Sequence, residues 1–148
     1  MSLKTRIQED MKSALRAKDS ARLSALRLLI AAIKQREIDE RHALDDMAVT
    51  ATIEKLVKQR RDAAAQYDAA NRPERAAGER FEIEVLSAYL PEALSDDALE
   101  QAIAAALSET QAAGIADMGK VMGVLKPRLA GRADMAEVSR RVRARLGS

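Results

Sequence analysis

The spacing of hydrophobic residues predicts helices along the N-terminal part of the chain. Leu3, Ile7 and Met11 recur every four residues, which places them on one face of a helix, and Ser2 before them is a typical N-cap. Similar patterns return three times, each after a capping or helix-starting residue such as Asp45 or Pro73. The predicted helices of this part span residues 3–17, 20–40, 46–70 and 73–90.

A proline interrupts the helical pattern after this fourth stretch. Pro91 ends the helix because proline lacks a backbone N–H and disfavours a helical residue before it, and Ser95 can then cap the next helix. We therefore expect a domain boundary here. It divides the chain into an N-terminal helical domain over residues 1–92 and a C-terminal three-helix domain over residues 93–148.

Three shorter helices are predicted in the C-terminal domain from their start and stop residues. Gly114 is expected to end the first one in a left-handed conformation, and Gly131 the second. Asp117 is the expected N-cap of the second helix. Asp134 and Glu137 have the spacing of a capping box at the start of the third.

Composition supports an all-α fold and excludes several kinds of chemistry. Only 2% of the residues are aromatic, whereas alanine and leucine are abundant, which favours closely packed helices over a sheet. The chain has no cysteine and a single histidine, His42, so we expect no disulfide, no thiolate nucleophile and no metal site. His42 lies among charged residues, where a solvated side chain is expected, and no catalytic residue or cofactor motif stands out.

The hydrophobic runs are too short for a membrane segment. The longest apolar runs, residues 28–33 and 102–107, fall far below the roughly 18 residues that a membrane span needs. They also fall short of the roughly 7–15 apolar residues of a signal peptide. We therefore expect a cytoplasmic protein that has no membrane partner.

Charge is unevenly distributed although the formal net charge is only +2. Residues 1–44 carry 10 Lys and Arg against 6 Asp and Glu, and residues 45–116 carry 7 against 14. Residues 117–148 carry 8 against 3. The chain thus has two basic ends and an acidic middle, a pattern that suits an anionic partner or a charge-balanced surface.

The second predicted C-terminal helix contains unusual residues for a helix. Gly119 and Gly123 lie four residues apart and leave one side of the helix without side chains, where another backbone could approach closely. Packing against a neighbouring helix is the alternative explanation. Pro127 should kink or end this helix and so expose Lys126 and Arg128.

Basic residues surround this segment and continue along the last predicted helix. Their density, with few aromatic residues nearby, favours contact with phosphate groups over stacking on single-stranded bases. A solvated basic face is the alternative that charge alone leaves open. The residues are Lys120, Lys126, Arg128, Arg132, Arg140, Arg141, Arg143 and Arg145.

An ordered set of short motifs resembles one protein family along essentially the whole chain. The set includes LRLLIAAIKQREID, KLVKQRRDAAAQYDAANR, YLP before an LSD-type cap, and GKVMG before a GRAD turn. Together these segments resemble the GatB/YqeY family of small bacterial proteins. The resemblance implies an N-terminal helical domain followed by a three-helix domain similar to the tail of the B subunit of tRNA-dependent amidotransferases.

The resemblance also implies a function for the C-terminal domain. The amidotransferase tail contacts tRNA, whereas the label attached to the free-standing proteins is carbon–nitrogen ligase activity with glutamine as amido donor. This chain has no counterpart of the kinase-like cradle domain or of the Ser-Lys amidase elements, so we carry over only RNA binding. The segment that matches the tail contributes Lys120, Gly123, Lys126, Arg128, Gly131 and Arg132.

Two main hypotheses about function follow from the sequence, and an enzyme that acts on a small amide is a third, for which no catalytic residue is identified. The first is a non-catalytic tRNA-binding accessory protein, and its candidate nucleic-acid-binding residues are Lys120, Gly123, Lys126, Arg128, Gly131, Arg132, Arg140 and Arg141. The alternative is a helical adaptor that docks on a protein such as an amidotransferase or a synthetase. Its interface would lie on the acidic middle or around Lys34, Arg36, Lys58, Arg60 and Arg61.

Overall fold

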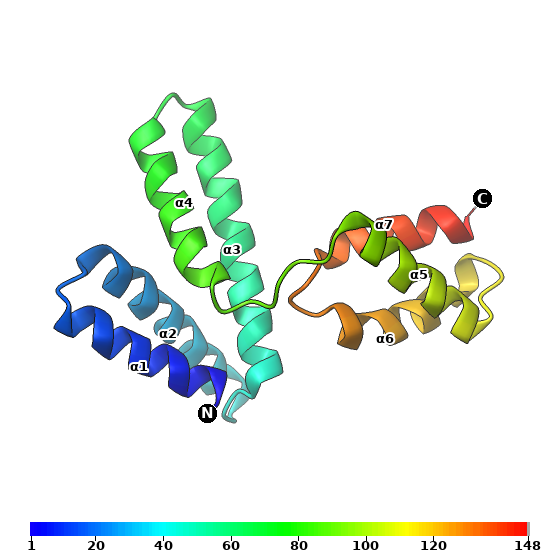
Figure 1. Cartoon of the computed structure of the whole chain (residues 1–148), viewed down its shortest axis with the longest axis horizontal. Coiled ribbons are helices and arrows are strands. Elements are labelled where there is room, and N and C mark those ends of the chain that lie inside the picture. The colour runs from blue at the N-terminus through cyan, green and yellow to red at the C-terminus, as the bar shows by residue number, and fades with distance from the viewer. Residues whose placement is uncertain (148) are drawn as a thin grey trace. The chain divides into compact units, whose positions relative to one another are not determined.

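All regular structure in the described part of this protein is helical. The structure, a computed structural model, describes residues 1–147, and every regular element in that range is a helix, which confirms the predicted all-α class. The chain divides into two compact units, unit 1 over Met1–Leu90 and unit 2 over Pro91–Ser148. Figure 1 shows the helices of each unit.

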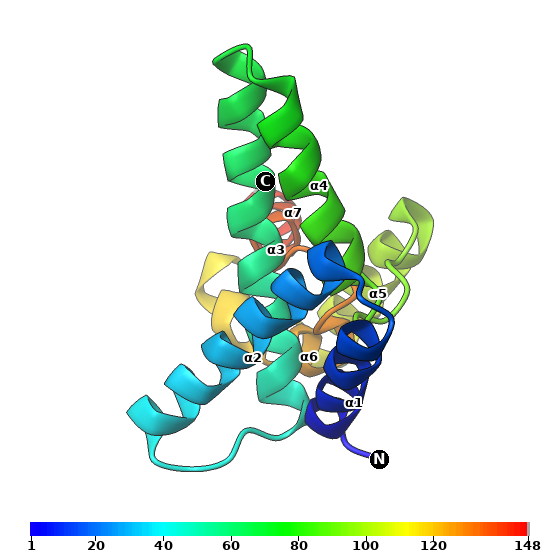
Figure 2. The same ribbon diagram turned by 90° about the vertical axis from the view of Figure 1, so that its left-hand side faces the viewer.

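Unit 1 contains four helices whose starts follow the predicted capping residues. Ser2, Asp19 and Asp45 each accept a hydrogen bond from the backbone N–H three residues further on, and Pro73 is the first residue of the fourth helix. The helices, seen from a second side in Figure 2, are α1 (Leu3–Arg16), α2 (Ser20–Glu40), α3 (Asp46–Ala69) and α4 (Pro73–Ser87).

The core of unit 1 is built at one end of the hairpin that α3 and α4 form. Leu26, Leu29 and Ile53 are fully buried there. Tyr89 closes this core from the end of α4, and its hydroxyl donates a 2.6 Å hydrogen bond to Asp10 on α1. Further along the hairpin alanines replace the large side chains, so that α3 and α4 extend as a thin pair of helices (Figure 1).

Unit 2 packs three short helices around its own core. Its elements are α5 (Asp96–Thr110), the 3-10 turn η1 (Ile115–Asp117), α6 (Met118–Leu129) and α7 (Met135–Leu146). Ile103, Val121, Leu125 and Val138 are fully buried between these helices. Burial of this apolar face supplies the main driving force for a unit of this size.

Two predicted features at helix ends in unit 2 need correction, and the first concerns α5. Gln111, not Gly114, takes the left-handed conformation after α5, with φ of 52°. The helix ends there because the Ala112 N–H turns back to the Leu107 carbonyl at 3.2 Å, and Gly114 is extended. Gly131 does adopt the predicted positive φ, at 77°.

The second correction concerns Pro127 in helix α6. The helix continues to Leu129 because Pro127 lies in its last turn, where the missing N–H removes only the bond to the Gly123 carbonyl. The Ala130 N–H still reaches the Lys126 carbonyl at 3.0 Å. Pro127 therefore does not end α6.

Two acidic residues in unit 2 have roles other than the capping predicted for them. Asp117 does not cap α6 with its side chain; its carboxylate instead accepts the N–H of Ala113 at 2.8 Å and so closes the turn before the helix. Asp134 caps α7 as predicted. Glu137 was predicted to complete a capping box, but its carboxylate instead accepts hydrogen bonds from Arg140 and Arg141 of α7.

Candidate nucleic-acid interface

Part of one side of α6, at Gly119 and Gly123, is open and carries no side chain. Gly119 and Gly123 share this side, and a Cβ added to either residue would meet no heavy atom of a neighbour within 4 Å. A glycine that allows two helices to pack closely would place neighbouring atoms within that distance. The packing alternative therefore does not account for these glycines, and the side remains accessible to an approaching molecule. We call Gly119 and Gly123 the glycine strip.

Two lysines flank the glycine strip. At about 100° per residue, Lys120 and Lys126 lie roughly 60° to either side of Gly123 around the axis of α6. Both are exposed, and within residues 1–147 neither makes a hydrogen bond or an ion pair. The pKa of Asp117 is lowered mainly by its hydrogen bonds from the Ala113 and Gly114 N–H groups, and the positive charge of Lys120 lowers it further.

Arg128 is held by a carboxylate of the neighbouring helix. Its guanidinium donates two hydrogen bonds to Glu109 on α5, at 3.1 Å and 2.7 Å. This bidentate pair lowers the pKa of Glu109. Arg128 is therefore less available for phosphate than the two lysines are.

Arg141, a predicted nucleic-acid-binding residue, lies at the centre of an ion-pair network. Its guanidinium contacts Glu137 at 2.9 Å, Glu100 at 2.9 Å and Asp96 at 3.0 Å, which leaves its side chain only 25% exposed. Arg145 adds a second ion pair to Glu100, at 2.5 Å. Hydrogen bonds from these two arginines lower the pKa of Glu100.

The acidic residues of unit 2 thus equal its basic residues in number. Residues 91–148 carry 8 Lys and Arg and 8 Asp and Glu, so unit 2 has no net formal charge. The sequence gives no local sign of this pairing, because Glu100 and Arg141 are 41 residues apart and Glu109 and Arg128 are 19 apart. Arg140, by contrast, pairs with Glu137 but keeps its side chain 75% exposed.

Two other predicted residues have structural roles in the turn between α6 and α7. Arg132 donates a 3.1 Å hydrogen bond from Nε to the Glu92 carbonyl, and its own carbonyl accepts the Leu94 N–H at 3.0 Å. These contacts hold the segment before α5 against the turn. The positive φ of Gly131 is what allows the turn itself.

Basic residues of unit 1 predicted for a protein interface fall into two groups. Arg36 donates to the Ala48 carbonyl at 2.9 Å, and Arg60 faces Glu82 at 2.5 Å, so both help to hold helices together. Lys34, Lys58 and Arg61 are exposed and, within the part of the chain that the structure describes, have no charged or hydrogen-bonded partner.

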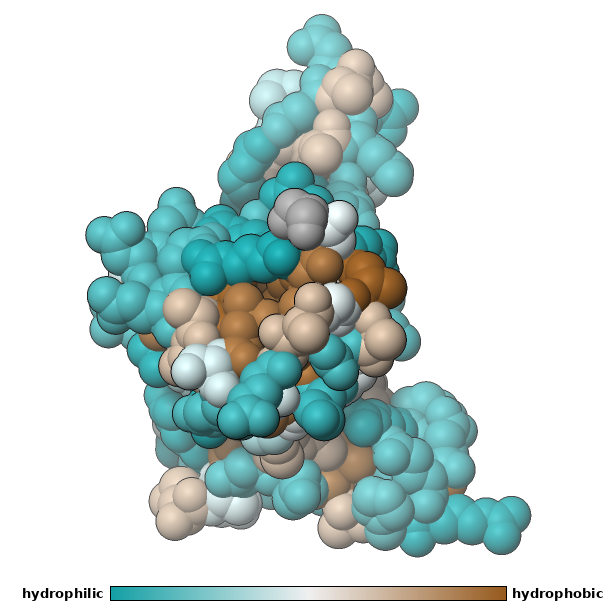
Figure 3. Space-filling model, turned by 90° about the vertical axis from the view of Figure 1, so that its right-hand side faces the viewer, coloured by the Kyte–Doolittle hydropathy of each residue, from teal (hydrophilic) through white to brown (hydrophobic). Residues whose placement is uncertain are grey.

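Residues 1–147 show no sign of metal chemistry or of a membrane segment. No group of three or more His, Asp or Glu side chains in this range could hold a metal ion, and none of the helices described is long and apolar enough to cross a membrane. His42 is 62% exposed and lies 3.0 Å from the Ala43 carbonyl. Figure 3 shows an apolar area among polar side chains on unit 2. Ile115, a residue of this unit, is 49% exposed.

Comparison with known proteins gives one family and a group of distant relatives. The family model described as "Yqey-like protein" matches residues 4–146. Relatives named "Altered inheritance of mitochondria protein 41, mitochondrial" are 32% identical over 88 residues in Candida glabrata and 35% identical over 85 residues in Lachancea thermotolerans. These matches cover 58% and 57% of this chain and 48% and 46% of the relatives, so the chain spans about half their length.

Proposed function

Because the chain belongs to the Yqey-like protein family, whose model covers residues 4–146, we propose that it is a tRNA-binding accessory protein that performs no catalysis itself. The observation that carries the proposal is the open glycine strip of α6 with Lys120 and Lys126 on its two sides. The C-terminal part of the chain resembles in sequence the tail of an amidotransferase B subunit, and this resemblance suggests tRNA as the ligand. In this role the protein works beside enzymes that charge or modify tRNA, in the cytoplasm.

The strip suits a phosphate backbone for steric and electrostatic reasons. A sugar–phosphate chain can approach the α6 backbone at Gly123 because no side chain holds it away, and two ammonium groups lie within reach on either side. Lysine and phosphate contacts of this kind position an RNA without reading its sequence. Recognition would therefore depend on the shape of the RNA, which is the common mode for structured RNA.

Carboxylates limit the interface to this side of α6. Glu109 neutralises Arg128, and three carboxylates surround Arg141, so a phosphate brought to either arginine would meet negative charge. Among the predicted binding residues, Lys120, Gly123 and Lys126 form the centre of the proposed interface. Arg140, exposed on α7, can add a peripheral contact.

Binding of labelled tRNA at several salt concentrations tests the proposal. We expect affinity to fall steeply with salt, and the variant Lys120→Ala with Lys126→Ala to bind more weakly with a salt slope smaller by roughly 2, about one for each lysine that no longer meets a phosphate. The matched control is Lys58→Ala with Arg61→Ala, which removes the same charge from α3. Equal weakening in both variants, or affinity that does not depend on salt, would overturn the proposal.

A further inference from the structure

The outward face of α2 has an exposed pattern that RNA binding by unit 2 does not use. Leu28, Ala31, Gln35 and Ile38 follow one another at three and four residues, and all four are exposed. Leu28 is 48% exposed and Ile38 is 70% exposed, whereas the opposite face of α2 is buried in the core of unit 1. We call these four residues the α2 seam.

A basic edge runs along the α2 seam. Arg27 and Lys34 each precede a seam residue and are seven residues apart, and Arg41 follows seven residues later at the end of the helix. This is the spacing of the charged edge in a heptad repeat, where apolar positions face a partner helix and flanking charges select it. None of the three cations has a hydrogen bond or ion pair within residues 1–147.

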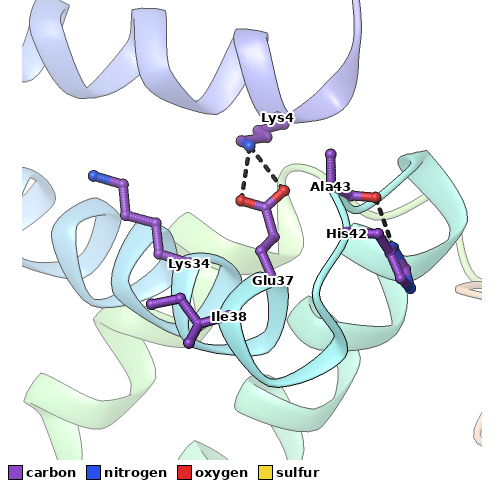
Figure 4. Close-up of a pocket in the computed structure, with 6 residues that line it drawn as sticks. All are labelled: Lys4, Lys34, Glu37, Ile38, His42 and Ala43. Carbon is purple, nitrogen blue, oxygen red and sulfur yellow. Dashed lines mark hydrogen bonds and ion pairs between the residues drawn. The ribbon is translucent and has the colours of Figure 1, made fainter.

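A surface pocket adjoins the basic edge. It has a volume of about 350 Å³ and is lined by Lys4, Lys34, Glu37, Ile38, His42 and Ala43 (Figure 4). Lys4 donates to both Glu37 oxygens at 2.8 Å, and this bond is the main cause that lowers the pKa of Glu37. The Lys4–Glu37 pair is satisfied, so Lys34 is the lysine of the pocket that remains available to an acidic group.

From the seam, its edge and the pocket, we propose that α2 is a docking surface for an amphipathic helix of a partner protein that carries Asp or Glu along one edge. Leu28 and Ile38 would contact apolar side chains of that helix, and its carboxylates would face Arg27 and Lys34. A side chain of the partner helix fits the pocket beside Ile38. Asp39 lies on the other edge of the α2 seam and would repel the acidic edge of the partner helix. It therefore favours the orientation in which that acidic edge faces Arg27 and Lys34.

An antiparallel second copy and nucleic acid fit the α2 seam less well than an acidic partner helix. Two copies of α2 packed antiparallel would place Arg27 and Lys34 of one copy against the same residues of the other, so like charges would face each other. Nucleic acid would leave the exposed Leu28 and Ile38 without apolar contacts. The proposal is independent of RNA binding, because the seam lies in unit 1 and the glycine strip lies in unit 2.

A pair of synthetic helices tests the proposal on the full chain. The probe is a peptide of the same 21-residue length as α2, with leucine at its apolar heptad positions and glutamate at its flanking positions, and the reference peptide has lysine in place of glutamate. We expect the glutamate peptide to bind at least about tenfold more tightly than the lysine peptide, as measured by fluorescence anisotropy. Equal binding of the two peptides would overturn the proposal.

Variants of the chain locate the binding surface. Arg27→Glu with Lys34→Glu should reverse the preference, so that the lysine peptide binds more tightly, whereas Lys58→Glu with Arg61→Glu should leave it unchanged. Ile38→Ser should weaken binding about tenfold or more, and the control Leu15→Ser, at a residue of α1 that is 54% exposed, should not. A preference that does not reverse refutes the charge argument.

Sedimentation of the chain and tRNA binding by the same variants distinguish the other occupants. The proposal predicts a chain that does not self-associate through α2 and tRNA affinity that Ile38→Ser leaves unchanged. A dimer that Ile38→Ser dissociates would assign the seam to a second copy. Loss of tRNA affinity in that variant, with no peptide binding, would assign the seam to RNA; either result overturns the proposal.

Discussion

Replacement of Gly123 tests the central structural observation, that α6 is open on one side. Glycine inside a helix is less favourable than alanine by about 1 kcal/mol, because its unfolded backbone has more freedom to lose. A Cβ at Gly123 would meet no neighbouring atom within 4 Å, so no steric penalty offsets this gain. Gly123→Ala should therefore stabilise unit 2 by about 1 kcal/mol, and Gly123→Leu by slightly less because leucine is a slightly weaker helix former.

Hydrogen exchange measured by mass spectrometry resolves this effect within unit 2. A gain of about 1 kcal/mol should slow the exchange of protected α6 amides about fivefold in both variants. Gly123→Leu should at the same time weaken tRNA binding, because its side chain fills the space that the RNA backbone would use. Faster exchange in either variant would show that Gly123 is packed, and unchanged tRNA affinity in Gly123→Leu would remove the strip from the interface.

Other predictions concern the contacts that hold each unit. Burial and then the Asp10 hydrogen bond raise the pKa of Tyr89 to about 12, so its stabilising effect should be complete below pH 10 and should disappear as the pH rises from 10 to 12. Tyr89→Phe should remove that pH dependence from chemical unfolding curves and destabilise unit 1 by about 1–2 kcal/mol at neutral pH. Arg141→Ala should lower the melting temperature of unit 2 more than Arg140→Ala does. The difference should shrink as the pH falls below 4.5, because the pKa of Glu100 is lowered in the folded state and protonation of Glu100 then breaks its ion pair with Arg141. Gln111→Gly should stabilise unit 2 by up to about 1 kcal/mol in the exchange experiment, because residue 111 has a positive φ that glycine adopts freely.

The starts of the helices could be predicted from the sequence because capping is a local interaction. Ser2, Asp45 and Ser95 each bond to a backbone N–H three residues away, so a short stretch of sequence contains both partners. The ends were harder to predict. Lys18 and Gln111 adopt positive φ values of 58° and 52° at helix ends where no glycine marks the turn.

The candidate site could be predicted only in part, because charge balance depends on which helices pack together. The C-terminal segment is basic in composition, but the sequence does not show that Arg128 and Arg141 are partnered by carboxylates 19 and 41 residues away. The same limit applies to Gly123, since the helical period shows that it shares a face with Gly119 but not whether another helix covers that face. The α2 seam itself was not predicted, although Lys34 on its edge was among the residues of the predicted protein interface and the heptad spacing is present in the sequence.

Crosslinking in living cells is the most direct test of RNA binding through α6. Ultraviolet crosslinking of the full chain, followed by sequencing of the bound RNA and mass spectrometry of the protein, identifies both partners of each contact. The account predicts that tRNA is the main crosslinked RNA and that the crosslinked peptides come from α6, residues 118–129. Crosslinks to other RNA classes, crosslinked peptides confined to unit 1, or the absence of bound RNA would contradict it.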